Sequence, residues 1–114
     1  MEPTIELLNQ AYRAFNAKDI EGVLATLHPD VDWPKAWEGE RVVGHAAVRD
    51  YWTRQFAEID PYVEPRGFHQ LPDGRVRVEV HQVVRDPAGN ILFEGDVAHV
   101  YTFRDGSVVR MDVE

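Results

Sequence analysis

Hydrophobic residues in the first part of the chain recur with the period of an α-helix. Within residues 4–17 they are spaced by three, four and three positions, which places Ile5, Leu8, Tyr12 and Phe15 on one helix face. Thr4, directly after a proline, is a suitable N-cap for this segment. The pattern therefore predicts an amphipathic helix over 4–17.

Two further segments carry a helical pattern. Asp19 can cap a short helix over 20–27, which His28-Pro29 would end. Residues 45–58 fit a third helix, whose inner side is marked by Val48, Tyr51, Trp52, Gln55 and Phe56. Between these two segments, residues 30–43 predict a short strand, Val31-Asp32-Trp33, followed by a loop that contains Pro34, Trp37 and Gly39.

From Pro61 onward the hydrophobic period changes to two, which is typical of β-strands. Asp73-Gly74, the segment 87–90 and Asp105-Gly106 each interrupt the apolar runs with turn residues. The second half therefore predicts a four-stranded antiparallel meander. We find no repeat or linker, so residues 1–114 are expected to form one α+β domain with helices on one face of a sheet.

The turns also predict which residues lie opposite one another, because a hairpin loop sets the register of its strands. The loop at 87–90 places Val78 opposite His99, Val76 opposite Tyr101 and Val80 opposite Val97. A two-residue turn at 105–106 places Asp112 opposite His99 and Arg110 opposite Tyr101. A two-residue turn at 73–74 places His69 opposite Val78.

These pairings predict a polar row on the otherwise apolar inner face of the sheet: His69, His99 and Asp112, with Arg110 and Tyr101 beside it. Charged groups in a closed core require partners, whereas a pocket between sheet and helices accommodates them. We therefore expect a ligand pocket on this face. Its expected lining, besides that row, consists of Val78, Val80 and Val97 from the strands and Tyr12, Phe15, Trp33, Trp37, Trp52 and Phe56 as an aromatic wall.

Composition narrows the possible partners. The 114 residues include no cysteine, which excludes disulfides and thiolate metal sites and favours a cytoplasmic location. The formal net charge of −8 disfavours nucleic acids and anionic membranes. The sequence has neither an apolar run near the ~20 residues of a membrane span nor a recognisable leader.

Three stretches resemble the SnoaL-like polyketide cyclase group of the nuclear-transport-factor-2-like (NTF2-like, or cystatin-like) superfamily: AYRAFNAKDIEGVLATLHPDVDW, VVGHAAVRDYW and HVYTFRDGSVVRMDV. This group is in turn similar to ketosteroid isomerases. The resemblance covers nearly the whole chain. It implies a cone-shaped fold, in which three N-terminal helices pack on the concave face of a curved, mostly antiparallel sheet. It implies little about the reaction, because the superfold hosts cyclases, isomerases, hydrolases and plain binding proteins.

The same resemblance implies an acid–base histidine and aspartate on the last two strands, which His99 and Asp112 match. An imidazole takes and returns protons near neutral pH, and a carboxylate partner would raise its basicity. The structural alternative is a His–Asp pair that only joins two strands. Arg110 could bind a ligand carboxylate or neutralise Asp112. His69 could be a second polar group of the pocket or an exposed side chain of a strand shifted in register.

The leading hypothesis is therefore a cofactor-independent cyclase or isomerase that acts on a hydrophobic carbonyl compound, without a metal. The alternatives are a non-catalytic ligand-binding protein and a dimerisation module of the same fold. Family resemblance also predicts a homodimer through the outer sheet face. Four apolar residues are expected to be exposed on that face: Val83, Leu92, Val100 and Met111.

Overall fold

The computed structural model describes residues 3–35 and 39–114. Its three helices lie where the sequence predicts them: α1 spans Pro3–Asn16, α2 spans Ile20–Leu24 and α3 spans His45–Glu58. Asp19 caps α2, since its carboxylate accepts a hydrogen bond from the Gly22 amide at 3.0 Å. The short helix ends earlier than expected, because His28 and Pro29 belong to the following strand.

Six strands form one sheet in the order β2-β1-β6-β5-β4-β3. The predicted meander is confirmed as β3 (Asp60–Gln70), β4 (Val76–Arg85), β5 (Ile91–Arg104) and β6 (Ser107–Val113). Two strands extend it, β1 (Leu27–Lys35) and β2 (Glu40–Val43). β1 pairs in parallel with β6, whereas the other neighbours are antiparallel.

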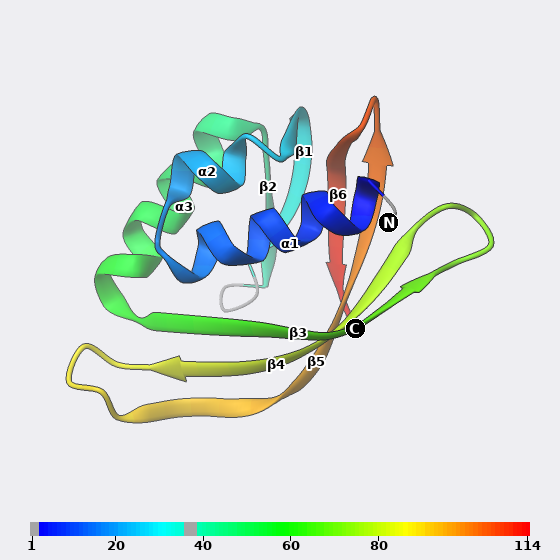
Figure 1. Ribbon diagram of the computed structural model, residues 1–114. Coiled ribbons are helices and arrows are strands. Elements are labelled where there is room, and N and C mark those ends of the chain that lie inside the picture. The colour runs from blue at the N-terminus through cyan, green and yellow to red at the C-terminus, as the bar shows by residue number, and fades with distance from the viewer. Residues whose placement is uncertain (1–2, 36–38) are drawn as a thin grey trace.

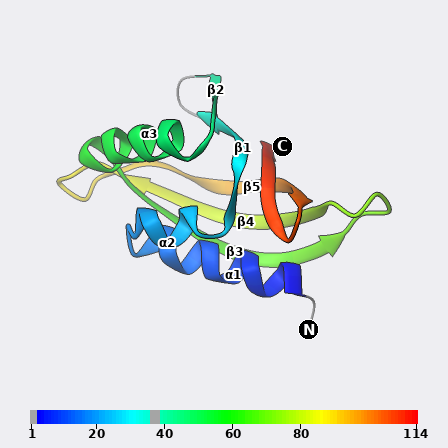
Figure 2. The same cartoon turned by 90° about the horizontal axis from the view of Figure 1, so that it is seen from above.

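The sheet bends so that β3, β4 and the first part of β5 form one wing, and β6, β1 and β2 form the other (Figure 1). The helices lie inside this bend, which we call the concave face; the opposite side is the convex face (Figures 1 and 2). The core lies between them and includes Leu8, Val48 and Trp52 from the helices and Val76, Val78, Val80 and Val108 from the sheet. The α+β fold class is confirmed.

Asn16 fixes the C-terminal end of α1 to the edge of the sheet. Its side-chain nitrogen donates to the Val63 carbonyl at 2.7 Å, and its side-chain oxygen accepts from the Val63 amide at 2.9 Å. β3 is an edge strand, so both backbone groups would otherwise lack a partner in the sheet. The Asn16 side chain thus fixes the position of α1 relative to β3.

The register of the central hairpin is as predicted: Val78 lies opposite His99, and Val76 opposite Tyr101. The prediction for β6 is correct only as far as Phe103 and Val108. Beyond this pair the register shifts by one residue at Val109, so that Tyr101 faces Met111 and Val100 faces Asp112. An extra residue in one strand sends every later side chain to the other face. The predicted pairs His99–Asp112 and Tyr101–Arg110 are therefore wrong.

The first hairpin also differs from the prediction by one residue. Leu71 donates its amide hydrogen to the Arg75 carbonyl at 2.8 Å, so the loop has three residues, 72–74, instead of two. Gly74 takes the positive φ of 91° that such a loop requires. As a result His69 lies opposite Arg77 on the convex face, while Phe68 points inward opposite Val78.

Candidate functional site

A cavity of about 100 Å³ lies between the helices and the concave face of the sheet. Helices α1 and α3 and four strands contribute most of its wall, and its described lining residues are predominantly aromatic or aliphatic. They are Ala11, Tyr12, Phe15, Val23, Leu27, Trp33, Pro34, Tyr51, Trp52, Gln55, Pro61, Val63, Gln82, His99, Tyr101, Val108, Met111 and Val113. No Asp, Glu, Lys or Arg is among them, so the described wall carries no fixed charge at neutral pH.

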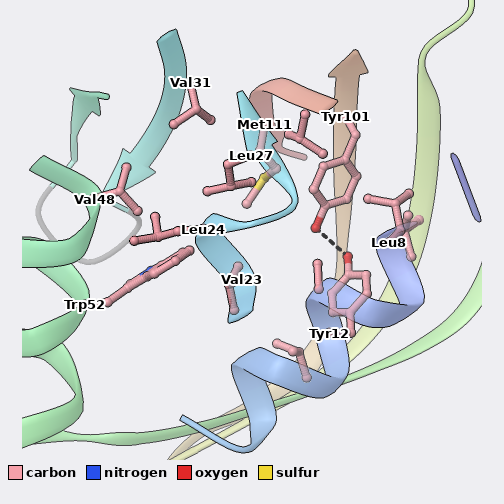
Figure 3. Packing of buried hydrophobic residues seen from close by; sticks show 14 of the residues in the cluster. Leu8, Tyr12, Val23, Leu24, Leu27, Val31, Val48, Trp52, Tyr101 and Met111 are labelled. Carbon is pink, nitrogen blue, oxygen red and sulfur yellow. Dashed lines mark hydrogen bonds between the residues drawn. The ribbon is translucent and has the colours of Figure 1, made fainter. Parts of the chain in front are cut away.

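Three polar side chains in this wall form a hydrogen-bonded relay. The Tyr101 hydroxyl donates to the Tyr12 hydroxyl at 2.8 Å, and the Tyr12 hydroxyl lies 2.9 Å from Nδ1 of His99. Figure 3 shows Tyr12, from α1, and Tyr101, from β5, with their hydroxyl groups pointing toward one another. The relay joins the first helix to the longest strand across the core.

The relay determines where the imidazole of His99 carries its proton. Because the Tyr101 hydrogen is directed to the Tyr12 oxygen, the Tyr12 hydrogen is free to bond to Nδ1 of His99. Nδ1 is then an acceptor, and a neutral ring must carry its hydrogen on Nε2. His99 thus presents an N–H donor on the side of the ring away from the tyrosines.

Burial keeps all three groups of the relay neutral at physiological pH. It lowers the pKa of His99 to about 4, because the charged imidazolium would lose its hydration. Burial likewise raises the pKa of Tyr12 well above its usual value, with a further contribution from the neighbouring Tyr101. The pKa of Tyr101 is also raised by burial. The imidazole is therefore a hydrogen-bond donor at neutral pH and a weak base.

Nε2 of His99 has no hydrogen-bond partner among the described residues, although the side chain lines the cavity. In the described part of the chain no side-chain nitrogen or oxygen is both occluded and unpaired, so this atom retains access to the cavity. A donor inside an apolar wall requires an acceptor, which water or a ligand oxygen can provide. Nε2 is thus a hydrogen-bond donor that the cavity offers to a ligand.

The predicted aromatic wall is largely assembled. The ring of Trp33 packs edge-on against Trp52 with centroids 5.2 Å apart, and Phe15 packs against Trp52 at 5.8 Å. Phe56 packs behind Phe15 at 5.3 Å and does not line the cavity. Trp37, the remaining predicted member, lies outside the described residues. The wall offers flat apolar surfaces to a ring-shaped ligand.

Asp112 and Arg110 are not part of the cavity, contrary to the prediction. The shift at Val109 places both on the convex face, where Arg110 donates to Asp112 at 2.8 Å and to Asp32 at 3.0 Å. Arg41 completes this network with Asp32 at 2.6 Å and Asp112 at 3.2 Å. These arginines lower the pKa of Asp112, Arg110 most of all. The network joins β2, β1 and β6 and does not contact His99.

Four further residues predicted for the pocket, all on strands, also lie outside the cavity. His69 is exposed on the convex face and bonds to Glu79 at 2.7 Å. Val78 and Val80 are buried in the core and do not line the cavity. Val97 is partly buried and packs against the core. His69 and Asp112 therefore lie on the opposite face of the sheet from His99, so these three side chains do not share one site. In the described ranges no cluster of three or more His, Asp or Glu residues is arranged to hold a metal ion.

The sequence analysis missed the roles of two glutamines and the partnership of the tyrosines. Gln55 lines the cavity and donates to the Tyr51 hydroxyl at 2.9 Å, while Gln82 lines it from β4. A signal for Gln82 existed, because it occupies an inward position on a strand whose other inward residues are valines. Tyr12 carried a similar signal, since a tyrosine on an apolar helix face needs a partner for its hydroxyl.

None of the helices that the structure describes is long and apolar enough to span a membrane. No curated protein matches the chain in sequence. Solved structures are similar over nearly its whole length. The protein TerC, crystallised with polyporic acid, shares 31% identity at a TM-score of 0.86, with 99% of this chain and 91% of TerC covered.

Two bacterial structures show the same fold. An NTF2-like protein of unknown function from Burkholderia pseudomallei K96243 shares 26% identity at a TM-score of 0.86, with 100% of this chain and 91% of that one covered. A proposed polyketide cyclase from Xanthomonas campestris pv. campestris shares 25% identity at a TM-score of 0.81, with 97% and 88% covered. The family model described as "SnoaL-like domain" matches residues 8–111. This chain therefore belongs to the SnoaL-like domain family, as its sequence pattern indicated.

Proposed function

We propose that the protein binds a small, mainly apolar carbonyl compound in the cavity, with the carbonyl oxygen accepting a hydrogen bond from Nε2 of His99. The single observation that carries this proposal is the unpaired Nε2 donor inside an uncharged aromatic wall. A cavity of about 100 Å³ accommodates about one aromatic ring, so a larger ligand extends toward the more exposed lining residues. Val113, which is 43% exposed, is one of them.

The family relation supports a small-molecule ligand of this kind. TerC, at 31% identity, was crystallised with polyporic acid, and the Xanthomonas campestris protein is a proposed polyketide cyclase. Neither ligand nor reaction transfers directly to this chain. Both observations support a ring-shaped, mainly apolar ligand, which the aromatic wall of the cavity also favours.

A second candidate is a cofactor-independent cyclase or isomerase that uses the same contact. A neutral imidazole N–H can polarise a carbonyl and stabilise an enolate oxygen that develops when a neighbouring C–H loses its proton. The relay favours this role, because Tyr12 and Tyr101 hold the ring in the required tautomer. The proton acceptor would have to be water or a group of the substrate, since no described lining residue is a carboxylate. For this reason we place binding first.

The test is a titration with para-acetylbiphenyl, a flat aryl ketone, followed by the fluorescence of the cavity tryptophans Trp33 and Trp52. His99→Phe removes the donor and keeps a ring, whereas His99→Gln retains a side-chain N–H. We expect the ketone to bind to the wild type, to lose roughly ten-fold in affinity in His99→Phe and to recover part of it in His99→Gln. Binding that is unchanged in His99→Phe would contradict the proposal.

We also propose that the protein forms a homodimer through the convex face. Tyr62 supports this, because it lies opposite Val83 on that face and is 47% exposed, and Leu92 of β5 is 54% exposed. The sequence analysis expected more apolar exposure there, but Val83, Val100 and Met111 are buried within the protomer. Tyr62→Lys should shift the mass in analytical ultracentrifugation from dimer to monomer, whereas Glu58→Lys on α3 should not. A monomeric wild type at micromolar concentration would remove the proposal.

A further inference from the structure

We infer that Gln82 is a second ligand-anchoring residue, which recognises a neutral oxygen at the end of an elongated ligand remote from His99. The inference rests on the function proposed above and specifies its ligand class. It predicts a molecule with two polar ends, one at Nε2 of His99 and the other at the Gln82 amide. The apolar middle of this molecule would lie against the aromatic wall.

Gln82 is a polar exception in an apolar stripe. The other inward residues of β4 are Val76, Val78, Val80 and Val84, all of them buried. Gln82 lies opposite Val63 of β3 and Gly95 of β5, and it lines the same cavity as His99. Neither Val63 nor Gly95 has a polar side chain with which the Gln82 amide could form a hydrogen bond. The neighbouring strands therefore give no reason for a polar residue at this position, whereas a ligand in the cavity would.

The Gln82 side chain has no hydrogen-bond partner among the described residues. Gln55, the other glutamine of the cavity, differs in this respect, since its amide donates to the Tyr51 hydroxyl at 2.9 Å. No polar side-chain atom in the described ranges is both occluded and unpaired, so the Gln82 amide remains accessible. It therefore offers a free N–H pair and a free carbonyl to whatever occupies that part of the cavity.

The distance between the two anchors sets the length of the ligand. Val78 lies opposite His99, and Gln82 lies opposite Gly95, which is four residues from His99 on β5. Four residues of strand correspond to roughly 13 Å between the backbones. The ligand is therefore longer than one ring, and its second polar group lies about four strand residues from His99, beside Gln82.

The chemistry of the second polar group follows from the lining. An amide both donates and accepts, which suits a hydroxyl or a keto oxygen. None of the described lining residues is Lys or Arg, and the formal net charge of the chain is −8, so a carboxylate or phosphate at this end would lack a counter-ion. The geometry thus points to an uncharged hydroxy-ketone or diketone of two or more rings.

The experiment compares two ligands that differ by one hydroxyl, para-acetylbiphenyl and para-acetyl-para′-hydroxybiphenyl, by isothermal titration calorimetry. The wild type should bind the hydroxylated ketone roughly three- to ten-fold more tightly. Gln82→Met, which keeps the side-chain length and removes the amide, should abolish this preference, so that the two ketones bind with equal affinity. Gln55→Met is the matched control and should retain the preference.

The outcomes separate this inference from the proposed function. If both ketones bind in a His99-dependent way but the hydroxyl confers no preference, or the preference persists in Gln82→Met, the role of Gln82 is refuted and the function stands. If neither ketone binds to the wild type, both proposals fail. A far-ultraviolet circular dichroism spectrum equal to that of the wild type shows that each variant is folded.

Discussion

The Tyr12 hydroxyl lies 2.9 Å from Nδ1 of His99, although 87 residues separate the two in the sequence. The same hydroxyl accepts a hydrogen bond from Tyr101 at 2.8 Å, so one oxygen on α1 satisfies two side chains of β5. This contact joins the stability of the core to the chemistry of the cavity. It determines which ring nitrogen of His99 faces a ligand.

Tyr12→Phe should cost about 1–3 kcal/mol of unfolding free energy, because it leaves polar atoms of Tyr101 and His99 buried without their partner. Tyr101→Phe should cost less, since the Tyr12–His99 bond survives. In a double-mutant cycle measured by urea denaturation, the two losses should not add, because both remove the Tyr12–Tyr101 bond. Strictly additive losses would show that the relay is not energetically coupled.

The stability of the protein should fall as the pH decreases from about 6.5 to about 4. His99 has a lowered pKa in the folded state, so the unfolded chain binds the additional proton throughout this window, and stability rises with pH. The loss reaches its full value of about 3 kcal/mol near pH 4, where the folded protein begins to bind the proton as well. Urea denaturation of the wild type and of His99→Gln across this range measures it. Equal pH dependence in the two proteins would contradict the assignment.

His81 should titrate in the opposite direction. Its ring lies 2.8 Å from Asp96 and 3.0 Å from Glu94, and the hydrogen bonds to these carboxylates raise its pKa, Asp96 contributing most. The stabilisation is therefore complete at low pH and is lost as the pH rises through the raised pKa. Histidine ring signals in two-dimensional NMR should show that Asp96→Asn lowers the pKa of His81. No change on this substitution would indicate that the pair is not formed in solution.

Asp112→Asn should leave ketone affinity and the titration of His99 unchanged, because Asp112 lies on the convex face with Arg110 and Arg41. Its effect on stability should be no more than about 1 kcal/mol and should shrink with added salt, as expected for a partly exposed ion pair. Calorimetric titration and urea denaturation measure the two effects. A large loss of ketone binding would instead favour the dyad that the uniform hairpin register predicts.

Asn16→Ala should loosen the contact between α1 and β3. The Val63 amide and carbonyl would lose both hydrogen bonds to the side chain. We expect a loss of about 1–3 kcal/mol in unfolding free energy. In hydrogen exchange monitored by NMR, the Val63 amide should exchange faster than its neighbours in β4. Unchanged protection of Val63 would show that another group replaces the side chain.

The sequence predicted the elements whose pattern is regular. The helical spacing around Leu8 and Tyr12 and the alternating valines of β4 reflect burial on one face, which the fold confirms. The parallel pairing of β1 with β6 could not be predicted, because it joins residues such as Leu27 and Val108 without a connecting turn. His99 was placed on the correct face because its hairpin register is regular as far as Val84.

The partners of His99 were missed for a specific physical reason. A uniform register puts Asp112 beside it, whereas the extra residue at Val109 replaces that carboxylate with Met111 and Val113 on the cavity side. Of the two tyrosines beside His99, Tyr12 comes from helix α1, and Tyr101 lies two residues further along β5. Neither hairpin geometry nor helical periodicity encodes how a helix hydroxyl meets a strand imidazole.

The irregularity at Val109 also bears on how proteins of this shape diversify. Deleting Val109 itself would only make the ladder regular and would keep the pairs Tyr101–Met111 and His99–Val113. Substitutions alter such a wall one side chain at a time, whereas a single-codon insertion after Val109 would exchange Met111 and Val113 for Arg110 and Asp112 in one step. A change in the length of β6 by one residue can thus convert an uncharged cavity into a charged one without any substitution in the neighbouring residues.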